Sequence, residues 1–366
     1  MGSVKDLIVE NEATDQSVGW GIFDFSDRYS VFDWGEMPDH IPNKGAALCM
    51  MAAWNFEQLS KEGAQTHYLG IVVEQGVHKR ITSIDQIKEP TIKMAVSLSR
   101  VVEPVFVNGS YDYSYFINGQ GKINNFVVPL EVIYRNGAPK GSSLFKTIDE
   151  LERKGETDKL AKLLDKYGLT EKPQPGQLFP KTGYDFTTKF EPTDRKIDDE
   201  VAYLISGLTE EQFKQLKEIR ESAVNTVKKR GREVGLEDYD GKHEYRFFAG
   251  RISIADVFGT LDENRFMFSL NGKNVQVSKE FLRQYYKIHQ REWFEATEKA
   301  KVSAKEREVE DWITLCEIKP MNLEPRLVSL VGEMYAAASD RYTGFNFFKN
   351  ARPLEKVMED LLPYME

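Results

Sequence analysis

The chain has 366 residues and a formal net charge of −9, with 41% apolar and 29% charged residues. These proportions are ordinary for a globular protein, and the length suits two lobes that share an interface. No run of Lys and Arg is long enough for a basic stripe, so a nucleic-acid partner is not expected. The N-terminus lacks the apolar segment of a secretory signal, and no apolar run is long enough to span a bilayer. We therefore expect a cytosolic protein.

The N-terminal third carries two polar segments among short predicted strands. Gly2-Ser3-Val4-Lys5 is a glycine-started turn before an apolar strand at residues 7–9. Its N–H groups and ammonium suit a phosphate, and an ordinary strand start is the alternative. The second segment, 26–33, holds two Asp, an Arg and two Ser among aromatic residues, and Ile-Pro-Asn-Lys-Gly follows at 41–45. This density of polar side chains indicates either a ligand site or a surface loop.

Apolar periodicity predicts one helix in this third, from about Ala46 to Leu59. A buried strand follows at 127–135, and its alternation places Glu131 and Arg135 on one face. Charged side chains inside an apolar strand either pair with each other or bind a ligand, and the pattern leaves both possibilities open.

The rest of the chain is predicted to form helices and β-hairpins. Two short polar helices at 143–167 come first. A long helix begins at Thr209, because Gln212 three residues later completes a capping box. A hairpin turns at Ala249-Gly250, and Ser278 caps a further helix. The pattern as a whole is that of an α+β protein.

The densest chemical signal is Asp240-Gly241-Lys242-His243-Glu244. Period-2 spacing puts Asp240, Lys242 and Glu244 on one face of a strand, and the hairpin brings Asp256 near Glu244. Carboxylate oxygens beside a Lys are what Mg²⁺ and a polyphosphate need. A strict two-residue turn would put Glu244 and Asp256 on opposite faces, so we expect a bulge or a three-residue loop in this hairpin. His243 is expected to pack on the other face.

Taken in order, these segments resemble the SAICAR synthetase family, the phosphoribosylaminoimidazole-succinocarboxamide synthases of purine biosynthesis. The resemblance runs from Gly2 to about Gly344. It also rests on Phe-Thr-Thr-Lys-Phe-Glu at 186–191 with Asp194, and on Arg-Tyr-Thr-Gly at 341–344. Eight such motifs in the family order are hard to reach by chance.

Three departures from the family pattern affect the site. Ser3 stands where family members often have Lys, and Val257 stands where an acidic residue is common. The stretch between Arg135 and Ser142 is one residue longer than usual, which leaves open which serine near 142 contacts substrate.

The resemblance implies a ligase that joins 5-amino-1-(5-phosphoribosyl)imidazole-4-carboxylate to L-aspartate, with ATP and Mg²⁺ as cofactors. The residues that it assigns to nucleotide binding are Gly2, Ser3, Val4, Lys5, Val127 and Glu244. Those that it assigns to catalysis are Lys242, Arg135, Ser142, Arg265 and Asp194. Further substrate contacts are Ser30, Lys44 and Lys279, and the metal ligands are Glu244 and Asp256.

The fold implied is α+β of the SAICAR synthetase type. A β-rich N-terminal lobe at 1–135 would pack on an α+β ATP- and substrate-binding lobe at 136–345, with the active site in the cleft and a C-terminal helical extension at 346–366. Two other functions stay open: a small-molecule kinase of related fold, and a nucleotide-binding paralogue without turnover. The expected partners are small molecules, and the resemblance is compatible with a homo-oligomer.

Overall fold

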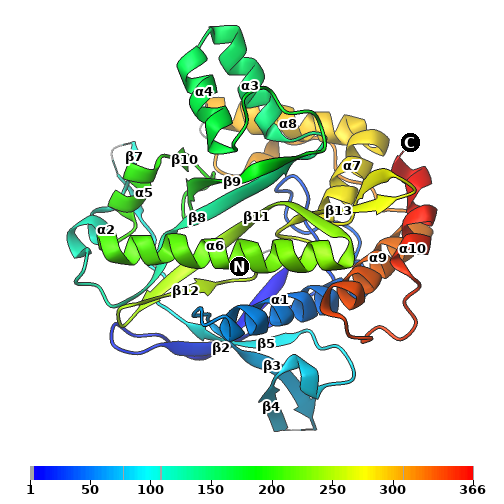
Figure 1. The fold of residues 1–366 in the computed structure, drawn as a ribbon, viewed down its shortest axis with the longest axis horizontal. Coiled ribbons are helices and arrows are strands. Elements are labelled where there is room, and N and C mark those ends of the chain that lie inside the picture. The colour runs from blue at the N-terminus through cyan, green and yellow to red at the C-terminus, as the bar shows by residue number, and fades with distance from the viewer. Residues whose placement is uncertain (1–3, 77, 108, 308, 366) are drawn as a thin grey trace.

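Two large antiparallel sheets and a layer of helices make up most of the fold (Figure 1), in a computed structural model that describes residues 4–76, 78–107, 109–307 and 309–365. The first sheet has the order β1-β2-β5-β3-β4, with β1 (Lys5–Asn11), β2 (Gly19–Phe25), β3 (Tyr68–Gln75), β4 (His78–Thr82) and β5 (Lys93–Leu98). The second has the order β10-β9-β8-β11-β13-β14, with β12 beside β11. Its strands are β8 (Asn125–Ala138), β9 (Gln177–Thr188), β10 (Lys196–Ile197), β11 (Leu236–Phe248), β12 (Arg251–Ala255), β13 (Arg265–Leu270) and β14 (Lys273–Gln276).

A short parallel bridge between Thr66 and Ile254 joins the two sheets. The backbone N–H of His67 donates to the Ile254 carbonyl at 3.1 Å, and the N–H of Ser97 donates to the His67 carbonyl at 2.8 Å. One hydrophobic core runs through both sheets, with Val96 of β5 and Ile254 of β12 fully buried in it. The sheets therefore hold a fixed relation to each other at the site described below.

Three long helices cover the sheets. α1 (Lys44–Lys61) packs on β2, β3 and β5, and α6 (Glu210–Val234) packs on β11 and β12. α9 (Pro325–Thr343) contacts both of these helices. The close approach of α9 requires Gly332, since a Cβ there would lie 2.6 Å from the Pro42 carbonyl oxygen. The predicted capping box at Thr209 is confirmed at the start of α6.

The remaining helices lie at the edges of this frame. α3 (Ser143–Lys154) and α4 (Thr157–Lys166) form a hairpin with a small core of its own, seen at the top of Figure 1. α7 (Lys279–His289), capped by Ser278 as predicted, leads into α8 (Arg291–Arg307). The shorter elements are α2 (Ser114–Gly119), α5 (Asp199–Ile205), β6 (Val105–Val107), β7 (Ser110–Asp112), η1 (Ile84–Gln86), η2 (Trp312–Leu315) and η3 (Leu362–Met365). Among the described residues, no helix has the length and apolar character needed to cross a membrane.

The C-terminal segment joins the main core. α10 (Leu354–Leu361) packs on α9 and β13, and it buries Leu354, Val357, Met358 and Leu361. β8 begins at Asn125 and belongs entirely to the second sheet, although the expected lobe boundary was residue 135. We propose that the first lobe ends before Asn125 and that residues 346–365 are an integral part of the second lobe.

The hairpin of β11 and β12 departs from expectation. Glu244 pairs with Ala255 and Phe248 pairs with Arg251, so the turn at Ala249-Gly250 has two residues and the predicted bulge or longer loop is wrong. Asp256 nevertheless faces the same cavity as Glu244. It lies one residue beyond β12 with a φ of 57°, and this left-handed conformation breaks the strand alternation. Aspartate is among the few residues that adopt it readily.

Candidate functional site

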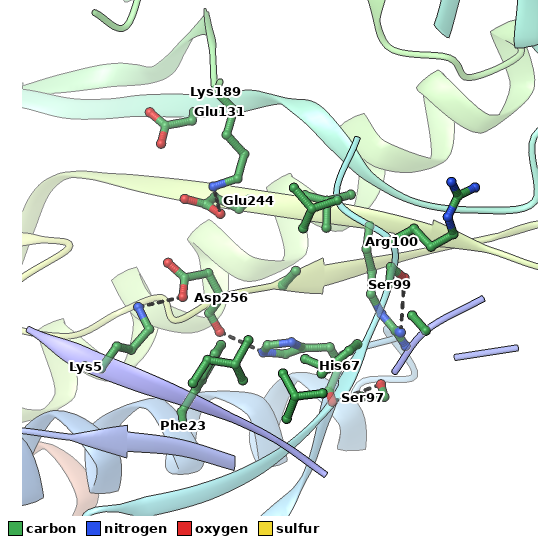
Figure 2. A pocket seen from close by; sticks show the side chains of 18 of the residues that line it. Lys5, Phe23, His67, Ser97, Ser99, Arg100, Glu131, Lys189, Glu244 and Asp256 are labelled. Atoms are coloured by element: carbon green, nitrogen blue, oxygen red, sulfur yellow. Dashed lines mark hydrogen bonds and ion pairs between the residues drawn. The ribbon is translucent and has the colours of Figure 1, made fainter. Parts of the chain in front are cut away.

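A cavity of about 900 Å³ lies where the two sheets meet, and Figure 2 shows its charged wall. β1, β2 and β5 line it from the first sheet, and β8 and β11 line it from the second. Its charged lining residues are Lys5, Asp6, Glu12, Arg100, Glu131, Lys189, Lys242, Glu244, Arg246, Asp256, Glu263 and Lys279. Cations and carboxylates thus share one wall of a cavity of ligand size.

Ion pairs connect most of these groups. Lys5 Nζ lies 2.7 Å from Asp256 Oδ1, and Lys189 pairs with Glu244 (Figure 2). Lys242 Nζ donates to Glu131 Oε1 at 2.7 Å and to Glu244 Oε1 at 3.1 Å. The predicted shared face of Lys242 and Glu244 on β11 is therefore confirmed, and charges from five segments of the chain meet around it.

Burial and pairing shift the pKa values of this network in opposite directions. Burial lowers the pKa of Lys242, but the surrounding carboxylates outweigh burial and hold that pKa well above its usual value. Burial raises the pKa of Glu131 to about 7, although Lys242 opposes the change. For Asp256, Lys5 and Lys242 outweigh the effect of burial, and the pKa falls to about 2. Asp256 and Lys242 are thus both charged at neutral pH.

The carboxylates of Glu244 and Asp256 have the hard oxygen donors that Mg²⁺ binds. Within the described part of the chain, no cluster of three or more His, Cys, Asp or Glu side chains forms a complete metal site. Two carboxylates facing one cavity fit a Mg²⁺ ion that takes its other ligands from water and phosphate oxygens, as Mg²⁺ usually does beside nucleotides. His243 lies on the other face of β11, buried against Tyr134 and Phe258 as predicted.

A second group of predicted residues gathers at the other end of β11. Asp240 pairs across the sheet with Arg135 on β8 and with Arg265 on β13. Arg265 Nε donates to Asp240 Oδ1 at 2.7 Å, and Arg135 donates to Ser142 Oγ at 3.2 Å. Two guanidinium groups therefore flank one carboxylate, which leaves positive charge for an anionic ligand.

A third group surrounds Asp262, which is almost fully buried. Lys44 Nζ lies 2.7 Å from Asp262 Oδ2, and the Tyr335 hydroxyl donates to Asp262 Oδ1 at 2.7 Å. Burial lowers the pKa of Lys279, and Asp262 opposes that change. Because Lys279 also lines the cavity, it connects this buried group to the main site.

Comparison with known proteins places this arrangement in a family. The family model described as SAICAR synthetase matches residues 13–300. A protein of Archaeoglobus fulgidus, provisionally named a phosphoribosylaminoimidazole-succinocarboxamide synthase, is 39% identical over 100% of both chains. The chain belongs to the SAICAR synthetase family.

Two solved structures share the fold. The SAICAR synthase of Saccharomyces cerevisiae in complex with SAICAR matches with a TM-score of 0.56 and 21% identity, over 94% of this chain and 93% of that one. A SAICAR synthetase in complex with ADP matches with a TM-score of 0.51 and 18% identity, over 88% of this chain and 99% of that one. The predicted α+β fold of the SAICAR synthetase type is thereby confirmed.

The family motifs fall into three places in the structure. Those that line the cavity are Val4, Lys5, Val127, Lys242, Glu244, Asp256 and Lys279. Those that lie outside its lining are Ser30, Lys44, Arg135, Ser142, Asp194 and Arg265. Asp194 is exposed, and partial burial raises its pKa while Lys242 and Lys189 oppose the change. Ser30 is partly exposed, and Gly2 and Ser3 lie outside the described residues.

Several cavity residues of this family member were not assigned from the sequence. Lys189 directly follows β9 and is the lysine of the Phe-Thr-Thr-Lys-Phe-Glu motif at 186–191, to which no role was assigned from the sequence. For Glu131, the sequence pattern allows either an ion pair or a ligand site. In the structure, Glu131 forms an ion pair with Lys242 and lines the cavity. Arg246 continues the alternation of Lys242 and Glu244 by one step, so extending that pattern would have found it. Glu263 gave no such signal, because no alternation marks the loop before β13.

Proposed function

We propose that the chain is an ATP-dependent ligase that joins 5-amino-1-(5-phosphoribosyl)imidazole-4-carboxylate to L-aspartate, forming SAICAR, ADP and phosphate. Membership of the SAICAR synthetase family supports this function. The observation that carries it is the meeting of Lys5, Lys189 and Lys242 with Glu244 and Asp256 in one cavity. The expected cytosolic setting stays a prediction.

We expect ATP binding in this cavity to replace the carboxylate partners of the lysines by phosphate oxygens. In the free protein the lysines neutralise the carboxylates of Glu244 and Asp256. A triphosphate would recruit Lys5 and Lys242, and a Mg²⁺ ion held by Glu244 and Asp256 would then neutralise phosphate charge. The related structure that contains ADP is consistent with a nucleotide in this family's cavity. Val127, on β8, would lie toward the base.

The two smaller substrates are anions and need their own cations. Arg135 and Arg265, with Ser142 nearby, are suited to the ribotide phosphate or carboxylate, because a guanidinium binds either anion with two parallel hydrogen bonds. Lys44 and Lys279 are further candidates, and Ser30 and Asp194 complete the proposed set of substrate contacts.

The chemistry requires a carboxylate to be activated before an amine attacks it. A carboxylate oxygen of the ribotide attacks the γ-phosphorus, and the bond from that phosphorus to the bridging oxygen of ADP breaks. The aspartate nitrogen then attacks the acyl carbon, an amide bond forms, and phosphate leaves. The amine must lose a proton in this step. With a pKa of about 7, Glu131 has the proton affinity to accept it at neutral pH.

The test is ADP formation with each substrate left out in turn, together with mass detection of the succinocarboxamide. We expect ADP release to depend on both the ribotide and L-aspartate and to stop when Mg²⁺ is chelated. Full turnover without aspartate, with a stable phosphorylated product, would establish a kinase instead. No turnover with every component present would establish a nucleotide-binding paralogue.

A further inference from the structure

Arg246 is a buried cation in the cavity wall that has no ion-pair partner in the described part of the chain. Its side chain is only 8% exposed, and its Nε has no hydrogen-bond partner among the residues that the structure describes. Among the described residues, its guanidinium makes one side-chain hydrogen bond, a long one of 3.4 Å to Ser99 Oγ. An arginine side chain is always protonated in proteins, so this buried guanidinium carries its positive charge at neutral pH.

This state contrasts with that of three lysines in the same cavity lining. Lys5, Lys189 and Lys242 each have a carboxylate partner. His67, which lines the same cavity, offers no counter-charge, because an imidazole is either neutral or cationic. A buried guanidinium without a partner destabilises the free protein, and a bound ligand that supplies acceptors would remove that penalty.

The position of Arg246 narrows the choice of ligand group. In Figure 2, Lys5 and Asp256 lie on one side of the cavity, and Ser97 and Ser99 lie on the other. The hydrogen bond to Ser99 puts the guanidinium on this second side, away from the proposed phosphate contacts. Arg246 also pairs across the sheet with Val127 of β8. Between this pair and the pair of Glu244 with Glu131, β8 has two more residues than β11, so β8 bulges there, at Pro129.

We propose that Arg246 is a specificity-determining residue of the nucleotide site, whose guanidinium donates hydrogen bonds to acceptors at the ribose and base end of ATP. A guanidinium has five N–H donors and no acceptor, so only an acceptor-bearing group satisfies it. Ribose oxygens and the ring nitrogens of adenine are such groups. This inference rests on the proposed function, because it assumes that the triphosphate lies at Lys5 and Lys242.

The test compares Arg246→Met with the parent enzyme. We expect the KM for ATP to rise by about 10-fold to 100-fold, as for the loss of a hydrogen bond to a charged group. The kcat should change little, and the KM values for the ribotide and for aspartate should stay the same. The ligand-free variant should unfold at the same temperature as the parent or a higher one, and the rise in unfolding temperature that ATP produces should shrink.

Arg220→Met is the matched control. Arg220 is equally buried, and its Nε also has no partner in the part of the chain that is described. Its guanidinium, however, stacks on the Tyr184 ring at 3.8 Å, outside the cavity lining. We expect this variant to unfold at a lower temperature and to keep the parent KM for ATP. A merely structural Arg246 would behave in the same way, and that result would overturn the proposal.

One nucleotide analogue, 2′-deoxy-ATP, and inorganic triphosphate locate the contact. If the partner is the ribose, 2′-deoxy-ATP should bind the parent more weakly and be nearly insensitive to Arg246→Met. If it is the base, the variant should discriminate against 2′-deoxy-ATP as much as the parent does. Inhibition by inorganic triphosphate should be equal in both proteins, and weaker inhibition of the variant would place Arg246 at a phosphate and refute the assignment. Thermal shifts with ATP also separate this outcome from failure of the ligase function, because binding is measured without turnover.

Discussion

Replacing Lys242 by Met should unbalance the charges of the cavity. The ammonium lies 2.7 Å from Glu131 and 3.1 Å from Glu244, and the side chains of these two residues are 8% and 9% exposed. Removing one partner of a buried ion pair costs about 3–5 kcal/mol, because the remaining charge is left in a poorly solvated place. Lys189 still pairs with Glu244, so the carboxylate most affected is Glu131.

This cost translates into a measurable change in unfolding temperature. A chain of 366 residues gains about 0.8 kcal/mol/K of entropy on unfolding, so 3–5 kcal/mol corresponds to a decrease of roughly 4–6 °C. The decrease should depend on pH. The pKa of Glu131 is raised by burial to about 7, so its proton binding favours the folded state at low pH, and this contribution is lost as pH rises through 7. Without Lys242 the pKa of Glu131 rises further, and the difference from the parent should shrink from pH 8 to pH 5.5.

The assay is thermal unfolding of Lys242→Met and of the parent at pH 8 and pH 5.5. Lys242→Arg, which keeps the charge, is the control, and Glu131→Gln combined with Lys242→Met should recover part of the loss at pH 8. A variant as stable as the parent at pH 8 would refute the reasoning. So would a decrease of the same size at both pH values, since it would show that lost packing rather than uncompensated charge causes the change.

Three further changes test other parts of the structure. Arg135→Ala should lower kcat/KM by about 10²-fold and leave the unfolding temperature unchanged. The reason is that, among the described side chains, the Arg135 guanidinium donates hydrogen bonds only to serine hydroxyls. Steady-state kinetics equal to the parent's would restrict Arg135 to a structural role. Asp256→Asn should abolish the Mg²⁺ dependence of nucleotide binding in thermal-shift titrations. The variant's free energy of unfolding should also depend less on pH in the acid range. In the parent, Lys5 and Lys242 outweigh burial and lower the Asp256 pKa to about 2. The resulting stabilisation is present above the unfolded pKa near 4 and is lost as pH falls toward 2. Leu361→Ala should lower the free energy of unfolding, measured in urea, by about 2–5 kcal/mol, because α10 belongs to the main core. An unchanged urea midpoint would show that α10 does not contribute to the stability of that core.

Local patterns were enough for the elements and for one face of the site. The capping box of Thr209 with Gln212 and the cap at Ser278 depend on hydrogen bonds within four residues, so the sequence states them directly. The same holds for the shared face of Lys242 and Glu244, because strand alternation has a period of two. The order of the motifs was sufficient to indicate the family, which the family match confirms.

Contacts between distant segments needed the folded chain. The orientation of Asp256 follows from a left-handed φ of 57° just beyond β12, and no pattern in the sequence predicts this backbone conformation. The pairing of Lys5 with Asp256 joins positions 251 residues apart in the sequence, and that of Lys189 with Glu244 joins two strands through a loop residue. Whether a charge is compensated depends on every neighbour within a few ångströms, and sequence spacing constrains only those on the same element. The guanidinium of Arg246 is the clearest case, since the alternation of β11 predicts its face but not that its Nε has no partner among the residues described.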